Sequence, residues 1–107
     1  MTDKIVVLNT CGSAAEAERL ARLLVDRRLA ACVSIAPQIR SFYRWKGAVE
    51  SSEEWLLLIK SSQPLFERLR NALESEHSYE VPEVLALPVV EGNASYLDWL
   101  QTSLEAD

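Results

Sequence analysis

Two long extended segments joined by one short turn constrain the fold of this 107-residue chain more than any other feature. The return arm covers residues 49–60, and the outgoing arm covers residues 39–46, with Gly47 at the turn. The outgoing arm continues a strand predicted over residues 30–35, which Pro37 breaks or bends because proline cannot donate to a strand ladder. The pattern predicts a long antiparallel hairpin, too long to pack wholly against a small core.

The return arm changes character along its length. Its first half, residues 50–54, is polar and acidic, which indicates a solvated or paired strand face and not a cation site. Its second half is apolar on both faces, which favours a central strand. The two apolar sets are Trp55, Leu57 and Ile59 on one face and Leu56 and Leu58 on the other.

Strand and helix signals precede the hairpin. Residues 4–9 carry an unbroken apolar run, typical of a strand covered on both sides. Ser13 and Glu16 then form a capping box, in which the Ser13 hydroxyl accepts from the N3 amide and Glu16 reaches back. The helix that they begin ends near Arg27 and Arg28.

The remaining elements follow the hairpin. Pro64 suits the first turn of a second helix that ends around residues 76–77. Residues 81–90 form a last strand, which Pro88 places at a sheet edge or bulge, and Gly92-Asn93 caps a short final helix. The order is βαββαβ with an extra C-terminal helix, so we expect an α+β, ferredoxin-like fold with its helices on one face of an antiparallel sheet.

Composition limits the class of protein. Hydrophobic residues make up 49% and charged residues 25%, as in one soluble globular domain over residues 1–107. The net charge of −5 argues against nucleic acid or an anionic membrane as partner. The chain shows neither a signal peptide nor a membrane span, and Cys11 and Cys32 are too few for a disulfide framework. We therefore expect a cytoplasmic protein with reduced thiols.

The single histidine is the best candidate metal ligand. No glycine-rich nucleotide loop, nucleophile elbow or zinc-protease motif occurs, so we expect no enzyme. His77 lies among Glu76, Glu80 and Glu83, and imidazole with carboxylates could hold Cu(II) or Zn(II), with further ligands from a neighbouring subunit. The alternative is a helix-end histidine that interacts with the helix dipole.

Four further polar side chains and the two thiols are other candidates. Lys60, Tyr79, Glu83 and Tyr96 could meet around one cleft, or form a hydrogen-bonded rim that holds the last strand. Cys32 suits a tightly packed strand. Cys11 precedes a helix, whose N-terminus would lower the pKa of an exposed thiol there.

The aromatic side chains near the hairpin turn have no obvious core to enter. Phe42, Tyr43 and Trp45 would form an exposed apolar patch, and such patches usually mark an interface. We infer a homo-oligomer.

Four short motifs, in order over residues 5–104, resemble the CutA divalent-cation-tolerance family. They are Leu29-Ala30-Ala31-Cys32-Val33, Tyr43-x-Trp45-x-Gly47, His77-x-Tyr79-x-x-Pro82-Glu83 and Tyr96-Leu97-x-Trp99. The resemblance implies the ferredoxin-like fold, a compact trimer whose long hairpins take part in intersubunit contacts, and a non-catalytic role in tolerance of copper and other divalent metals.

Only some of the metal-ligand residues that the resemblance implies are present at the matching positions of this chain. Metal-binding members have a cysteine before the threonine matched by Thr10, and two histidines before the tyrosine. This chain has Asn9 at the first position and Glu76-His77 at the second, so His77 alone carries over unchanged. Cys11 would point to the same side as Asn9 if the strand continues that far.

Two functions follow as hypotheses. The first is a cytoplasmic homotrimer that binds divalent cations such as Cu(II) weakly, at His77 and Glu76 with Cys11 as a substitute thiol. The second is a trimeric signalling or regulatory module that binds a small ligand in an intersubunit cleft containing Lys60, Tyr79, Glu83 and Tyr96.

Overall fold

The computed structural model describes residues 1–105 as one antiparallel sheet with three helices. The sheet order is β2-β3-β1-β4, so the first strand and the return arm of the hairpin are central, as predicted. In chain order the elements are β1 (Lys4–Cys11), α1 (Ala14–Asp26), β2 (Cys32–Trp45), β3 (Ala48–Ser62), a 3-10 turn (Gln63–Leu65), α2 (Phe66–Glu76), β4 (Leu85–Pro88) and α3 (Ala94–Leu104). The α+β, βαββαβ fold with an added C-terminal helix is confirmed.

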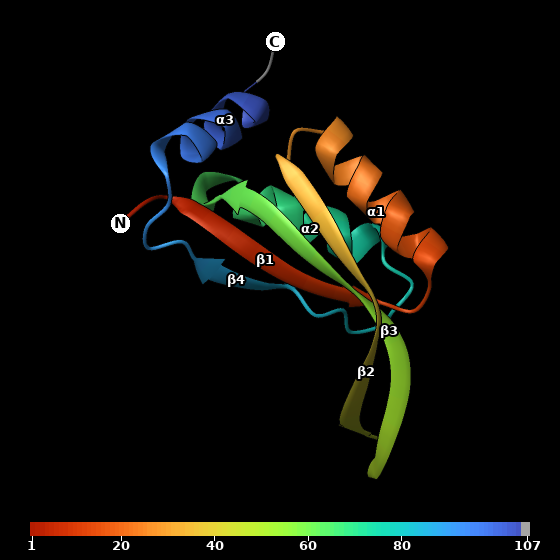
Figure 1. The fold of residues 1–107 in the computed structure, drawn as a ribbon. Helices are drawn as coiled ribbons and strands as arrows, with labels where there is room; N and C mark the ends of the chain where they lie inside the picture. Colours follow the sequence, from red (N-terminus) through yellow and green to blue (C-terminus); the bar gives the residue numbers. More distant parts are fainter. Residues whose placement is uncertain (106–107) are drawn as a thin grey trace.

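Helices α1 and α2 cover one face of the sheet (Figure 1). The side chains between these helices and β1 and β3 form the core, and burying each large aliphatic one contributes about 1.5–3 kcal/mol. The fully buried members are Val7, Leu20, Leu24, Leu57, Ile59, Leu69 and Leu73. The return arm therefore buries the face that carries Leu57 and Ile59.

The opposite face of the sheet keeps much of its apolar surface exposed. Alternation places Leu56 and Leu58 of β3 there, and both are only half-buried. On the edge strand β4, Leu85 is 55% exposed and Leu87 47%. A contiguous apolar surface of this kind is typical of an interface.

The hairpin has the predicted turn and the predicted break. Lys46 and Gly47 have φ of 49° and 85°, the left-handed pair that a tight two-residue turn requires, and glycine adopts it without strain. The register between β2 and β3 shifts between Ala36 and Ile39, on either side of Pro37. The strand begins at Cys32 and not at residue 30.

Only one of the two hydrogen bonds of the predicted capping box is present at the start of α1. The Ser13 hydroxyl accepts from Glu16 N at 3.1 Å. The Glu16 carboxylate, however, accepts hydrogen bonds from the backbone N–H and the hydroxyl of Ser78, both at 2.8 Å. It therefore connects the start of α1 to the segment after α2.

Two predictions at the C-terminal end need correction. The last strand covers four residues, Leu85–Pro88, and not residues 81–90. Pro82 has no N–H to donate, and Glu83 O accepts from the side chain of Asn9 instead of a strand neighbour. Asn93 occupies the N-cap position of α3, but its side chain makes no capping hydrogen bond.

Candidate functional site

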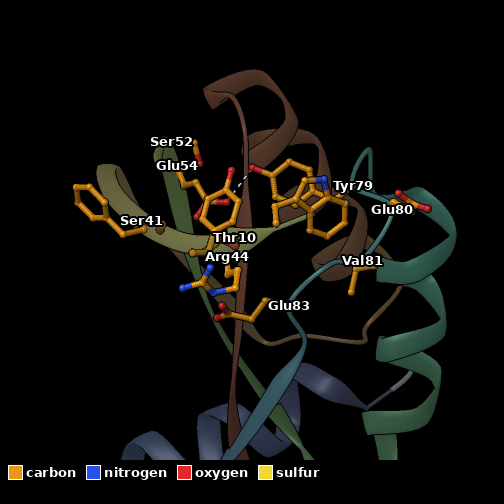
Figure 2. Close-up of a pocket in the computed structure, with 12 residues that line it drawn as sticks. Thr10, Ser41, Arg44, Ser52, Glu54, Tyr79, Glu80, Val81 and Glu83 are labelled. Carbon is orange, nitrogen blue, oxygen red and sulfur yellow. Dashed lines mark hydrogen bonds between the residues drawn. The ribbon is translucent and has the colours of Figure 1, made fainter. Parts of the chain in front are cut away.

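A pocket of about 820 Å³ lies between the far part of the hairpin and the segment that joins α2 to β4 (Figure 2). Strand β1 contributes one lining residue, the hairpin seven, and the joining segment four. The lining residues are Thr10, Ser41, Phe42, Tyr43, Arg44, Trp45, Ser52, Glu54, Tyr79, Glu80, Val81 and Glu83. Three carboxylates, one guanidinium and four aromatic rings therefore share one concave surface.

A buried carboxylate forms part of the pocket wall. Glu54 is 7% exposed, and its Oε2 accepts from the Tyr79 hydroxyl at 2.8 Å. Burial and this carboxylate neighbour raise the pKa of Tyr79 well above its usual range, so the hydroxyl stays protonated. Gly12 lies against the same ring, since a Cβ there would approach the Tyr79 oxygen to 3.4 Å.

Two contacts with β1 hold the joining segment in place. His77 Nε2 lies 2.8 Å from Thr10 O, and Asn9 Nδ2 donates to Glu83 O at 2.8 Å. Asn9 is fully buried, and its Oδ1 has no hydrogen-bond partner among residues 1–105. The β1 end therefore fixes both ends of the segment that carries Tyr79.

The imidazole of His77 is buried, and both of its nitrogens make hydrogen bonds. Its side chain is 0% exposed, and Nδ1 accepts from Tyr79 N at 3.0 Å. Because Nδ1 accepts, Nε2 carries the proton and donates to Thr10 O. The nearest carboxylate is Glu16, whose Oε2 lies 3.8 Å from Nδ1. Glu76 instead pairs with Arg19 at 3.2 Å.

The thiols differ from the prediction. Cys11 is 0% exposed, and its Sγ–H points at Ser13 O, 3.7 Å away. Burial, with the Glu16 charge nearby, raises the pKa of Cys11 to about 11. The expected exposure and lowered pKa are therefore wrong, because β1 continues through residue 11 and turns the side chain into the core. Cys32, expected to be tightly packed, is only half-buried.

The predicted metal ligands do not form one cluster. Within residues 1–105, no three histidine, cysteine, aspartate or glutamate side chains lie close enough together to hold a metal ion. His77 and Glu76 are adjacent in sequence, but they have separate partners, and Cys11 is enclosed.

The predicted cleft residues fall into two groups. Tyr79 and Glu83 line the pocket. Lys60 donates to Ser34 Oγ at 2.7 Å, and Tyr96 packs on Trp99 with 5.4 Å between ring centroids. Neither Lys60 nor Tyr96 lines the pocket.

The hairpin aromatics are exposed, as the sequence indicated. Phe42 is 72% exposed, Tyr43 42% and Trp45 41%. They carry apolar surface far from the core, and they also form one wall of the pocket.

Sequence reasoning missed Glu54 and Glu16. Glu54 lies in the run predicted to be a solvated or paired strand face, yet alternation puts it on the same strand face as Leu56, and this spacing was the available signal. Glu16 was assigned wholly to the helix cap, and its contacts with the segment after α2 have no sequence signal.

Comparison with known proteins identifies the family. Residues 5–103 match the model of the CutA1 divalent ion tolerance protein family. A divalent-cation tolerance protein CutA from Thermus thermophilus is 48% identical over 96 residues, which are 90% of this chain and 93% of that protein. Human protein CutA is 45% identical over 97 residues, which are 91% of this chain but only 54% of the human protein.

Solved structures agree with the sequence match. The crystal structure of CutA from Xylella fastidiosa superposes with a TM-score of 0.95 at 36% identity, covering 97% of this chain and 100% of that one. The fold, the family model and the sequence identity point the same way, and the chain belongs to the CutA1 divalent ion tolerance protein family.

Proposed function

We propose that this chain is a cytoplasmic homotrimer that acts in divalent metal tolerance by binding cations such as Cu(II) weakly, without catalysis. The observation that carries the proposal is the match of residues 5–103 to the divalent ion tolerance family. The net charge of −5 supports it, because a negative protein concentrates cations near its surface.

Exposed apolar surface supports the trimer. Leu85 and Leu87 on the sheet face opposite α1 and α2, together with the hairpin aromatics, expose large apolar side chains, and such surface is typical of an interface. Replacing Trp45, 41% exposed, with alanine should weaken assembly. Analytical ultracentrifugation over falling protein concentration measures this. An unchanged mass for W45A at every concentration would contradict a role of Trp45 in the interface.

The proposed weak cation site is at His77 and the carboxylates beside it, Glu76 and Glu16. Residues 1–105 alone do not form a complete ligand set there, so a neighbouring subunit supplies the remaining ligands. A cation can reach Nδ1 only after the Tyr79 N–H leaves it, and this exchange lowers the affinity. Glu16 Oε2, 3.8 Å from Nδ1, supplies an oxygen ligand on that side. The proposed ligand set leaves out Cys11, because a metal binds the thiolate and this thiol is buried and protonated.

Competition titration with a chelator tests the metal site. Wild type, His77→Ala and Glu76→Gln are titrated with Cu(II) side by side, and Glu74→Gln serves as control because Glu74 lies on the same helix, paired with Arg70. We expect H77A and E76Q to lose affinity while E74Q keeps it. Equal affinity in all four proteins would place the copper elsewhere.

Two free cysteines favour the cytoplasm. Cys11 and Cys32 are unpaired, as thiols remain in a reducing compartment. Cell fractionation tests this location, and recovery of the protein outside the cytoplasm would contradict it.

A small-ligand regulatory role is the second candidate, and the pocket favours it. Tyr79 and Glu83 keep their place in this hypothesis, since both line that pocket, whereas Lys60 and Tyr96 would belong to it only through a neighbouring subunit. A thermal-shift screen of charged and neutral metabolites tests it, because a ligand that binds only the folded state raises the melting temperature.

A further inference from the structure

We infer that Glu54 of one subunit forms an ion pair with Lys60 of the partner subunit, so that every contact between subunits contains one such pair. The two side chains lie on the same face of the sheet, at different positions along its central strand β3. This inference rests on the proposed homotrimer and adds the charged residues that join its subunits. It depends neither on metal binding nor on a ligand in the pocket.

Glu54 and Lys60 lie on the sheet face that α1 and α2 leave uncovered. Trp55, Leu57 and Ile59 of the same strand pack with the core on the helix side. Because side chains alternate along a strand, the even-numbered residues 54–60 point the other way. That is the face whose exposed apolar side chains indicate an interface. Each of the two charges therefore belongs to a surface that the proposed assembly covers.

One subunit leaves the charge of Glu54 without a cation. This side chain is 7% exposed, and its carboxylate accepts one hydrogen bond, from the Tyr79 hydroxyl at 2.8 Å. In the described part of the chain, no lysine, arginine or histidine lies within ion-pair distance of it. Buried charges are normally paired, so we expect a second subunit to supply the cation.

Lys60 lacks a carboxylate in the same way. Its Nζ donates to Ser34 Oγ at 2.7 Å and to Leu58 O at 3.3 Å, and both acceptors are neutral. Among residues 1–105, no carboxylate lies within ion-pair distance of Nζ. An ammonium group has three N–H donors, so one remains for an acceptor outside the subunit.

The other charged side chain on this face of the two central strands is already paired. Lys4 lies opposite Ser62 at the start of β1, and its Nζ contacts Asp3 Oδ1 at 2.7 Å. Along β1 and residues 54–62 of β3, the uncovered face therefore carries one acid and one base without a charged partner. Charged residues are depleted at the centre of an interface, and those that remain there need a partner of opposite charge.

The two charges cannot meet within one subunit. Six residues of extended strand separate them by about 20 Å. Subunits of a cyclic trimer join through two different patches, so the acidic position of one subunit can face the basic position of the next. Figure 1 shows the far part of the β2–β3 hairpin projecting beyond α1 and α2, where a second subunit can reach it.

Charge reversal followed by mixing tests a pair between subunits. E54K and K60E each place like charges at every contact, whereas a mixture of the two restores opposite charges wherever the variants alternate. Native mass spectrometry, with a heavy-nitrogen label on one variant, measures the composition of the trimers. Glu53→Lys is the matched control, because Glu53 adjoins Glu54 but is exposed on the other face of β3.

We expect E54K and K60E alone to dissociate at a protein concentration at least tenfold higher than wild type, and E53K to match wild type. Mixing E54K with K60E should give trimers that contain both variants and resist dilution better than either alone. Mixing E53K with K60E should give no such gain. The double variant E54K/K60E, which exchanges the two charges, should recover most of the lost stability of the trimer.

Neutral variants decide the question if charge reversal prevents folding. E54Q keeps an oxygen that can accept from Tyr79, and E54Q and K60Q should each weaken assembly while the double variant loses less than the sum. Unchanged assembly in the single variants, or no gain on mixing, overturns the ion pair and leaves the homotrimer in place. A wild type that is monomeric at every concentration overturns both.

Discussion

Removing one hydroxyl from Tyr79 should destabilise the protein measurably. Tyr79→Phe deletes the donor that lies 2.8 Å from Glu54 Oε2 and leaves the ring in place. A hydrogen bond to a charged group contributes about 1.5–3 kcal/mol. Glu54 is only 7% exposed, so water replaces the lost donor poorly, and we expect a loss of about 2 kcal/mol in the free energy of unfolding.

Urea unfolding at one fixed protein concentration measures this loss, because assembly makes stability depend on concentration. Tyr43→Phe is the control, since Tyr43 lines the same pocket and no described residue bonds its hydroxyl. The double variant with Glu54→Gln completes a cycle that isolates the pair, and a coupling energy of about 1 kcal/mol or more is expected. A change under about 0.5 kcal/mol in Y79F, equal to that in Y43F, would refute the importance of this contact.

Three further measurements test the core, the thiol and the tyrosine. Leu57→Ala, at a fully buried position, should cost about 2–5 kcal/mol in urea unfolding, whereas Val90→Ala, at a 56% exposed one, should change stability little. Cys11 should resist a thiol reagent at pH 8 until the protein unfolds, because it is enclosed and its pKa is about 11, so fast labelling of the native Cys11 thiol would contradict its placement. Above pH 10 an unfolded tyrosine ionises while folded Tyr79 keeps its proton, so stability should fall as pH rises, and a wild-type slope in Y79F would contradict this origin.

The fold could be predicted because its signals are local. The continuous apolar run over residues 55–59, the Ser13 cap and Gly47 at the turn each specify a nearby conformation. The capping and breaking residues agreed with the periodicity in most places. The exception is the segment before β4, where a β-like composition belongs to a loop because its polar groups bond β1 side chains and backbone.

The environment of the candidate side chains could not be predicted in the same way. Whether Cys11 is exposed depends on where β1 ends, and strand ends are the least certain part of a sequence-based assignment. Likewise, the enclosure of His77 arises from contacts with Thr10 and Tyr79, one of them 67 positions away in the chain. Residue type identified the candidates, but only tertiary contacts decide which of their atoms are free.

The same contacts explain why a carboxylate in an exposed-looking strand became buried. Glu54 belongs to a hairpin that is open to solvent along most of its acidic half, but it is buried itself and accepts a hydrogen bond from Tyr79. That segment is held at one end by His77 on Thr10 O and at the other by Asn9 on Glu83 O. Asn9 Oδ1 is buried and has no hydrogen-bond partner among residues 1–105, which costs stability. Asn9 thus helps to hold the segment of Tyr79 against Glu54. Asn9→Ala should loosen this segment. The loss in binding free energy of any ligand of the pocket should then exceed the loss in the free energy of unfolding.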